Sequence, residues 1–173
     1  HVRRLRCSVE MKIDDIKKLH QKKYRSEFSC YLVEGEHLIL ELEKAADTQA
    51  YLQGAKLFVT GNYQYWQTRF DKTVITERQM QQISDTKSPQ GIVAVVPMPS
   101  AKNLASAAAL LNSEGKSKPE RTIYLFETQD PGNLGTILRT LAWFGGFRCL
   151  LSPNSVDPYN PKVVRASMGA IFH

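Results

Sequence analysis

The stretch Asp130–Gly146, DPGNLGTILRTLAWFGG, holds the residue types of this sequence that are best suited to chemistry. Pro131 presets φ for a turn, Gly132 permits backbone conformations that other residues avoid, and Asn133 can cap the first turn of a helix. Where such a turn joins a strand to a helix, free N–H groups point outward and can bind a ligand. The pattern strongly indicates a turn and only moderately a ligand, because Gly132 and Gly135 lack the first glycine of the dinucleotide fingerprint.

The residues after this turn predict an amphipathic helix with a cation on its outer side. At 100° per residue, one apolar stripe contains Leu134, Ile137, Leu138, Leu141 and Phe144. Arg139 and Trp143 lie one turn apart on the opposite side. An exposed tryptophan beside an arginine is typical of contact surfaces. We therefore predict that Arg139 faces solvent, a partner subunit or a phosphate.

Positive charge is concentrated at the amino end of the chain. The net charge is +6, and residues 1–30 hold nine Lys and Arg against four Asp and Glu. Such a cluster is the electrostatic footprint expected for a polyanion partner, although a solvated helix face would look similar. The charge distribution favours nucleic acid as the partner.

The same sequence argues against several protein classes. No run of ~18 apolar residues exists, so a membrane span is not expected, and the first residues lack the apolar core of a signal peptide. Three cysteines, Cys7, Cys30 and Cys149, lie far apart. Their spacing fits neither a disulfide framework nor a metal site. We expect the three cysteines to be small buried apolar side chains, and the protein to lie in a reducing compartment, the cytoplasm.

Alternating strand and helix patterns predict an α/β layered domain over residues 1–98. The expected helices span 13–19, 36–46, 63–70 and 77–85, and the expected strands 30–33, 55–60, 73–77 and 92–98. Residues 99–119 are Ala-rich and predicted to be helical to Leu111, then polar with Gly115 and Pro119, and are predicted to link two units. From 120 to 173 we expect a strand at 122–127, the turn and helix above, a strand at 148–152 and a helix at 162–169.

Two long segments of the second unit resemble a known family. FETQDPGNLGTILRTLAWFGG and DPYNPKVVRASMGAIFH look like the first motif region of the SpoU (TrmH) class of RNA ribose 2′-O-methyltransferases, which belong to the knotted SPOUT superfamily. KYRSEFSCYLVEGEHLI and SDTKSPQGIVAVV resemble the L30e-like substrate-binding domain often fused in front. The resemblance implies an L30e-like α/β/α domain at 1–98, a linker at 99–119, and the amino-terminal part of a SPOUT-type α/β knot methyltransferase domain at 120–173.

The resemblance further implies S-adenosylmethionine-dependent methylation of a ribose 2′-hydroxyl in rRNA or tRNA by a homodimer. It assigns catalytic roles to Arg139 and Asn133, and RNA-binding roles to Lys22, Lys23, Arg25, Arg165 and Ser167. Arginine stays protonated at working pH, so we expect Arg139 to hold a phosphate and to stabilise charge that develops on the attacking oxygen.

The sequence departs from the family pattern at its carboxyl end. The family holds its cofactor in a carboxy-terminal knot with a Gly-Asn-Glu-Gly-type loop, which does not occur before His173. About 55 residues follow the predicted linker, fewer than the ~70–80 that usually support a core. We therefore expect a fragment of a longer enzyme, with no metal site, no cofactor-binding residue of its own and no turnover by this chain alone.

Two alternatives stay open at this point. The chain could be a non-catalytic RNA-binding module of L30e type, in which the methylase segment serves as a docking platform. It could also be an unrelated nucleotide-binding α/β enzyme that uses the loop 130–135. The second alternative lacks a complete phosphate-binding motif, since EGKS at 114–117 has Leu110 where the motif requires glycine.

Overall fold

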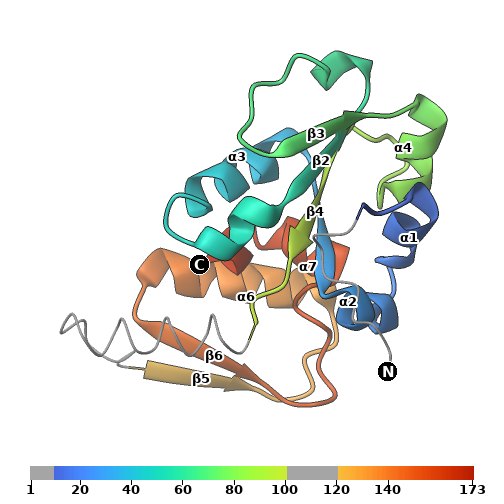
Figure 1. Cartoon of the computed structure of the whole chain (residues 1–173). Helices are drawn as coiled ribbons and strands as arrows, with labels where there is room; N and C mark the ends of the chain where they lie inside the picture. Colours follow the sequence, from blue (N-terminus) through green and yellow to red (C-terminus); the bar gives the residue numbers. More distant parts are fainter. Residues whose placement is uncertain (1–9, 101–120) are drawn as a thin grey trace.

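The computed structural model describes residues 10–100 and 121–173, and Figure 1 shows them as an α/β molecule with two sheets. The larger sheet has the strand order β1-β4-β2-β3. Its strands are β1 (Cys30–Glu34), β2 (Lys56–Val59), β3 (Asp71–Val74) and β4 (Ile92–Pro97). The β4 strand is antiparallel to both β1 and β2, and β2 is parallel to β3. The apolar, β-branched run of β4 suits this central, buried position.

Helices cover both faces of this sheet (Figure 1). One face packs against α1 (Ile13–Lys18), α2 (Lys22–Phe28) and α4 (Glu77–Ile83), and the other against α3 (Glu36–Ala45) and the 3₁₀ turn η1 (Ala50–Gly54). The α3 helix buries Leu38, Ile39 and Leu42, the stripe expected from the sequence. The α4 helix starts at a capping box between Thr76 and Gln79.

The second sheet is a parallel pair joined by a helix. It consists of β5 (Arg121–Leu125), α6 (Pro131–Phe144) and β6 (Phe147–Leu151), followed by α7 (Pro161–Ala166) and the 3₁₀ turn η3 (Ala170–Phe172). Pro131 opens α6 where its missing N–H costs nothing, and Gly145 ends the helix at φ 68°. This strand–turn–helix–strand unit places the DPGN turn at the carboxyl end of β5.

One apolar core connects the two predicted units. Val164 of α7 and Phe172 of η3 are fully buried among Tyr31, Leu42 and other residues of the larger sheet and α3. The predicted linker lies almost wholly outside the described residues, so the boundary at 99–119 stays a prediction.

Most elements expected from the sequence occur at or near their expected positions, with three corrections. The helix predicted at 63–70 is wrong: only a short 3₁₀ turn, η2 (Gly61–Tyr63), forms there, and Lys72 binds the carbonyls of Gln64 and Trp66 in the irregular segment that follows. The strand predicted at 73–77 is β3 at 71–74. The α2 helix was not predicted, because its run of Lys22, Lys23 and Arg25 conceals the apolar period.

Some expectations fall on residues that the structure does not describe. The Ala-rich helix predicted up to Leu111 and the basic residues at 3–6 are among them. No helix in the described ranges is long and apolar enough to cross a membrane.

Candidate active site

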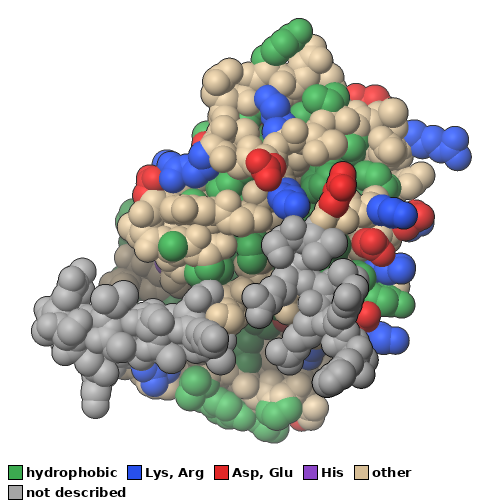
Figure 2. All heavy atoms as spheres, in the orientation of Figure 1, with side chains coloured by type: hydrophobic (Ala, Val, Ile, Leu, Met, Phe, Trp, Pro, Cys, Tyr) green, Lys and Arg blue, Asp and Glu red, His purple; other side chains and the backbone are tan. Residues whose placement is uncertain are grey.

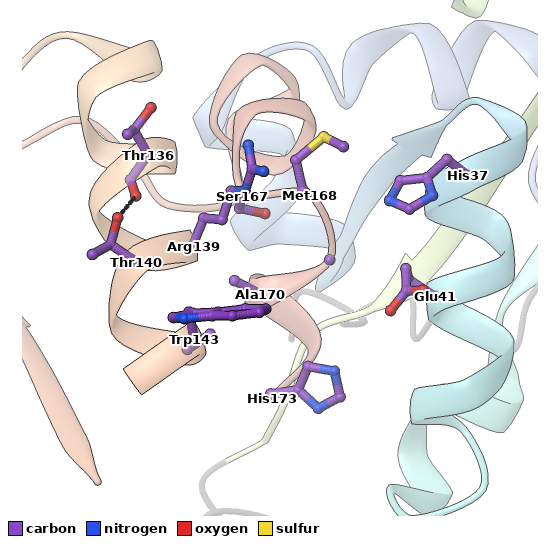
Figure 3. A pocket seen from close by; sticks show the side chains of 12 residues that line it. His37, Glu41, Thr136, Arg139, Thr140, Trp143, Ser167, Met168, Ala170 and His173 are labelled. Atoms are coloured by element: carbon purple, nitrogen blue, oxygen red, sulfur yellow. Dashed lines mark hydrogen bonds between the residues drawn. The ribbon is translucent and has the colours of Figure 1, made fainter. Parts of the chain in front are cut away.

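Three elements surround a hollow of about 870 Å³ beside Arg139 (Figure 3). The α6 helix contributes Arg139 and Trp143 to one wall, and α3 contributes His37 and Glu41 to the opposite wall. The turn from α7 into η3 runs between them. The other lining residues are Thr136, Thr140, Ala142, Ser167, Met168, Gly169, Ala170 and His173.

The α6 helix directs Arg139 into this hollow because its apolar side faces the protein. Leu134 is fully buried, whereas the Arg139 side chain is exposed and Trp143 is 86% exposed. The predicted apolar stripe does not continue to the end of the helix, since Phe144 is 72% exposed. Within residues 10–100 and 121–173, Arg139 forms no ion pair. Its guanidinium is therefore available to a ligand.

A glycine allows α6 to approach α7 closely. A Cβ on Gly135 would lie 2.9 Å from the Ala166 carbonyl carbon and from the Ser167 amide nitrogen, and closer still to the Ala166 Cβ. Gly135 is also buried. This contact places Ser167 one helical turn from Arg139 across the α6–α7 interface, which fixes one edge of the hollow.

The start of α6 differs from its sequence interpretation. Asp130, not Asn133, is the N-cap: the Asn133 N–H donates to Asp130 Oδ1 at 2.7 Å. The helix end thus carries its own carboxylate, so it does not offer a free anion-binding turn. Asn133 lines a second hollow of about 530 Å³ with Phe126, other residues of the 126–130 loop and the first turns of α6, and Thr136 borders both hollows.

The wall formed by α3 carries mixed charge. A hydrogen bond from Lys44 Nζ to Glu41 Oε1, 2.9 Å long, lowers the pKa of Glu41, and His37 and His173 add to this effect. Gly169 lets the α7–η3 turn approach this wall, because its φ is +96° and a Cβ there would lie 3.0 Å from the Glu41 Cβ. The amino-terminal unit (residues 10–98), predicted above to bind the substrate and called the substrate-binding unit below, therefore contributes directly to the hollow.

The other predicted residues of α7 have protein partners. The Ser167 hydroxyl is buried and donates to the Val164 carbonyl at 2.8 Å. Arg165 is exposed, and its Nη1 lies 3.2 Å from Asp85 Oδ2, across from α7. Asp85 also lies 3.8 Å from His20 Nδ1. Only Ser167 of these two predicted RNA-binding residues borders the hollow with Arg139.

The RNA-binding role predicted for Arg25 needs correction. Its side chain is 2% exposed, and Nη2 and Nε lie 2.8 and 2.9 Å from Asp157 Oδ2. Its Nη1 donates to the Leu19 carbonyl at 3.0 Å. A guanidinium with these partners inside the protein cannot reach an RNA phosphate.

Lys22 and Lys23 do lie on the surface, on the same short helix. The ammonium groups of Lys18 and Lys23 each lie 5.5 Å from the Tyr24 ring. Figure 2 shows Lys and Arg side chains along the edge where α1 and α2 lie, with acidic side chains between them. This basic edge is separate from the Arg139 hollow.

The sequence interpretation missed the two α3 residues of the site. His37 and Glu41 stand four residues apart, so they share one helix face, and that spacing was the only available signal. Their meeting with Arg139 depends on a contact between segments about 100 residues apart, which no local pattern encodes. In the described residues, no group of three or more His, Cys, Asp or Glu could hold a metal ion.

Two family matches cover most of the chain. Residues 10–94 match the family described as MRM3-like substrate binding domain, and residues 120–173 match the SpoU rRNA Methylase family. Among curated relatives, the 23S rRNA (guanosine(2553)-2′-O)-methyltransferase RlmP of Bacillus subtilis is 30% identical over 173 residues, covering 99% of this chain and 63% of that protein. The human mitochondrial rRNA methyltransferase 3 is 40% identical over 89 residues, which are 51% of this chain and 20% of that protein.

Solved structures agree with these matches. A structure from Porphyromonas gingivalis assigned to the TrmH family of RNA methyltransferases has a TM-score of 0.68 at 29% identity, over 95% of this chain and 61% of that one. An AdoMet-bound rRNA methyltransferase from Sinorhizobium meliloti has a TM-score of 0.67 at 26% identity, over 92% and 58%. The chain thus spans about three fifths of the length of these solved relatives and of the Bacillus enzyme.

Proposed function

The chain belongs to the SpoU (TrmH) class of the SPOUT superfamily, and from this premise we propose that it methylates a ribose 2′-hydroxyl of RNA with S-adenosylmethionine as methyl donor. The observation that carries the proposal is Arg139: its exposed guanidinium has no carboxylate partner among residues 10–100 and 121–173, and it borders a hollow that both units line. The RNA substrate is rRNA, the substrate class named for the relatives above.

Arg139 acts in this proposal as a fixed positive charge. Its guanidinium stays protonated, so it serves neither as proton acceptor nor as proton donor. It holds a phosphate beside the target ribose and stabilises the negative charge that develops on the 2′-oxygen as the methyl group is transferred. In this proposal Asn133 lies in the first turn of α6 beside the second hollow, Ser167 lines the Arg139 hollow, and Arg165 lies outside it, paired with Asp85.

The described residues do not fit a complete cofactor site. The hollow beside the β5–α6 loop is lined partly by exposed side chains, including Phe126 at 70% exposure. The N–H of Asn133 is already bound by Asp130, whose carboxylate disfavours a second anionic group at that helix end. We therefore assign no cofactor-binding residue within these ranges and no reaction step to one.

The proposal includes a homodimer in the cytoplasm. Exposed Trp143 and Phe144 on α6 are aromatic side chains of the kind enriched in protein interfaces. Figure 2 also shows hydrophobic side chains gathered along the edge of the molecule beside β5 and β6. Cys30, which is buried in β1, and Cys149, which is partly buried in β6, are compatible with a reducing compartment.

The test is transfer of labelled methyl groups from S-adenosylmethionine to rRNA by the complete protein. We expect Arg139→Ala to lower kcat about 10²–10³-fold, the range found for oxyanion-stabilising donors, and to change RNA affinity less than threefold. Arg148→Ala on β6 is the matched control, because that exposed arginine lies outside the hollow.

A second candidate function is RNA binding without catalysis. The exposed Lys22 and Lys23 on α2, which lie apart from the Arg139 hollow, are the observation that favours it. Tight RNA binding by the wild-type protein without any methyl transfer would establish this alternative. Methyl transfer that survives in Arg139→Ala, with RNA binding lost instead, would leave the enzyme but remove the role given to Arg139.

A further inference from the structure

A buried ion pair connects segments that are 132 residues apart. Arg25 of α2 directs both Nη2 and Nε at Asp157 Oδ2, at 2.8 and 2.9 Å. The arginine side chain is 2% exposed and that of Asp157 is 12% exposed. Because the third contact of the guanidinium is the Leu19 carbonyl, Arg25 also fixes the turn between α1 and α2.

Pairs of this kind are weak contributors to stability but sensitive to the loss of one partner. Desolvation of the two charges offsets much of their attraction, whereas removing one partner leaves the other charge buried and uncompensated. The hypothesis for this pair is therefore that it determines how two segments are placed more than how strongly they associate. The contacts around Arg25 and Asp157 identify the segment that the pair places.

Asp157 organises the loop that starts α7. Its Oδ1 accepts the Tyr159 N–H at 3.2 Å, and its carbonyl accepts the Asn160 N–H at 3.0 Å. Asn160 in turn caps α7 by accepting the Lys162 N–H at 3.0 Å. The Tyr159 ring packs against Tyr31 of β1, with the ring centroids 4.8 Å apart. Arg25 thus fixes the direction in which α7 leaves the larger sheet.

The α7 helix passes this placement on to α6. Gly135 of α6 lies directly against Ala166, and no side chain at position 135 would leave the two backbones at their present distance. Arg139 follows one turn later on α6, facing the hollow whose opposite wall is α3. The position of Arg139 relative to the substrate-binding unit therefore depends on a continuous series of contacts that begins at Arg25.

We propose that Arg25 and Asp157 are positioning residues for Arg139. The pair holds α7, and through it α6, in the register that brings Arg139 opposite His37 and Glu41, so that RNA held by the substrate-binding unit meets the guanidinium correctly. The predicted effect of the pair on methyl transfer rests on the proposed function. The predicted effect of the pair on the placement of α6 and α7 does not rest on it.

The experiment uses the complete protein with the variants Asp157→Asn and Arg25→Met, singly and together. Asp157→Asn keeps the size of the side chain and the acceptor for Tyr159, so it is the milder change. Arg69→Met is the matched control, because it removes the exposed Arg69–Asp47 pair, 2.6 Å long, from within the substrate-binding unit. Each variant is measured for kcat, for KM of the RNA and for amide hydrogen exchange.

We expect each single variant to lower kcat about 10–100-fold, as a displacement of about 1 Å at a reacting group does, with KM within twofold. The double variant should resemble the singles, because the two residues act as one unit. Amides of α6 and α7 should exchange at least tenfold faster, whereas Arg69→Met changes neither quantity. Arg25→Lys should not restore kcat, since an ammonium cannot make the forked contact.

The remaining outcomes decide against the proposal in distinct ways. Unchanged exchange in α6 and α7, with kcat within twofold, would reduce the pair to an ordinary structural contact. A tenfold loss of RNA affinity at unchanged kcat would make Arg25 an RNA contact after all. If the wild-type protein transfers no methyl group, the proposed function fails instead, and the exchange rates alone decide about the pair.

Discussion

At the scale of single residues, a missing side chain is as important to the site as the arginine that it places. Gly135 is not needed for an unusual φ, since it lies within the regular turns of α6. It is needed because α7 leaves no room for a Cβ. The two helices can approach each other because position 135 carries a hydrogen atom instead of a methyl group. The position of Ser167 beside Arg139 depends on this approach.

We expect Gly135→Ala to lower the free energy of unfolding by about 1–3 kcal/mol, the usual effect of overpacking, even though alanine favours helix. Chemical denaturation measures this change. Gly61→Ala is the control, because a Cβ at position 61 meets nothing within 4 Å. Equal stability of Gly135→Ala and wild type would show that α6 and α7 can separate slightly without loss.

The residue scale also shows where sequence interpretation succeeds. The exposure of Arg139 and Trp143 follows from helix period alone, and the structure agrees. The roles given to Asn133 and Arg25 do not follow from any period. Asp130 takes the cap because it stands three residues before the N–H that needs an acceptor, and Arg25 is buried because Asp157, far away in sequence, neutralises it.

At the scale of elements, the two exposed lysines of α2 are the remaining candidates for phosphate contacts. We expect Lys22→Ala with Lys23→Ala to weaken RNA binding and to reduce the slope of log affinity against log salt by about 1.5, the value for two lost phosphate contacts. Binding titrations at several salt concentrations measure it. Glu27→Gln on the same helix is the control and should leave the slope unchanged without weakening RNA binding. An equal loss of RNA affinity in Glu27→Gln would indicate damage to α2 itself.

The contact between β1 and the loop before α7 should be sensitive to alkaline pH. Burial, with smaller contributions from Tyr51 and Asp157, raises the pKa of Tyr159 from 10.0 to about 12. Because the folded-state pKa is raised, the protonated phenol stabilises the fold fully below about pH 10. This contribution is lost as the pH rises through about 12.

Tyr159→Phe cannot ionise, so its free energy of unfolding should fall less between pH 10 and 12 than that of the wild type. Denaturation at a series of pH values measures the difference. Tyr65→Phe is the control, because Tyr65 is 82% exposed. Identical pH profiles for Tyr159→Phe and wild type would mean that the phenol titrates without loosening this contact.

Elements are the level at which the sequence was most informative and also the level at which its limits appear. Alternating apolar patterns located β1, β2 and β4 and the helices α3, α4, α6 and α7. They did not locate α2, whose buried members Arg25 and Phe28 are too few to form a stripe. They also placed a helix over residues 63–70, where hydrogen bonds from the Lys72 side chain to the Gln64 and Trp66 carbonyls hold an irregular segment instead.

At the scale of the whole molecule, the sequence suggested two units in series, whereas the structure packs α7 and η3 into the core of the larger sheet. Local patterns cannot reveal this arrangement, because Val164 and Phe172 meet partners more than 100 residues away. The same arrangement explains how α3 comes to form one wall of the Arg139 hollow. The contacts that pack α7 and η3 into the core therefore also bring together the walls of the Arg139 hollow.

The shared core predicts that both units unfold together. The chain has two tryptophans, Trp66 in the substrate-binding unit and Trp143 on α6, so Trp143→Phe and Trp66→Phe provide one reporter for each unit. We expect their denaturation curves to coincide, as required for a single cooperative transition.

Phe172→Ala, added to each of these two variants, should lower the free energy of unfolding by about 3–5 kcal/mol and shift both curves equally, because Phe172 is 1% exposed in the common core. If only the curve reported by Trp143 shifts, which is the curve of the Trp66→Phe variant, the units unfold separately. The placement of Arg139 must then depend on the Arg25–Asp157 pair without help from the core.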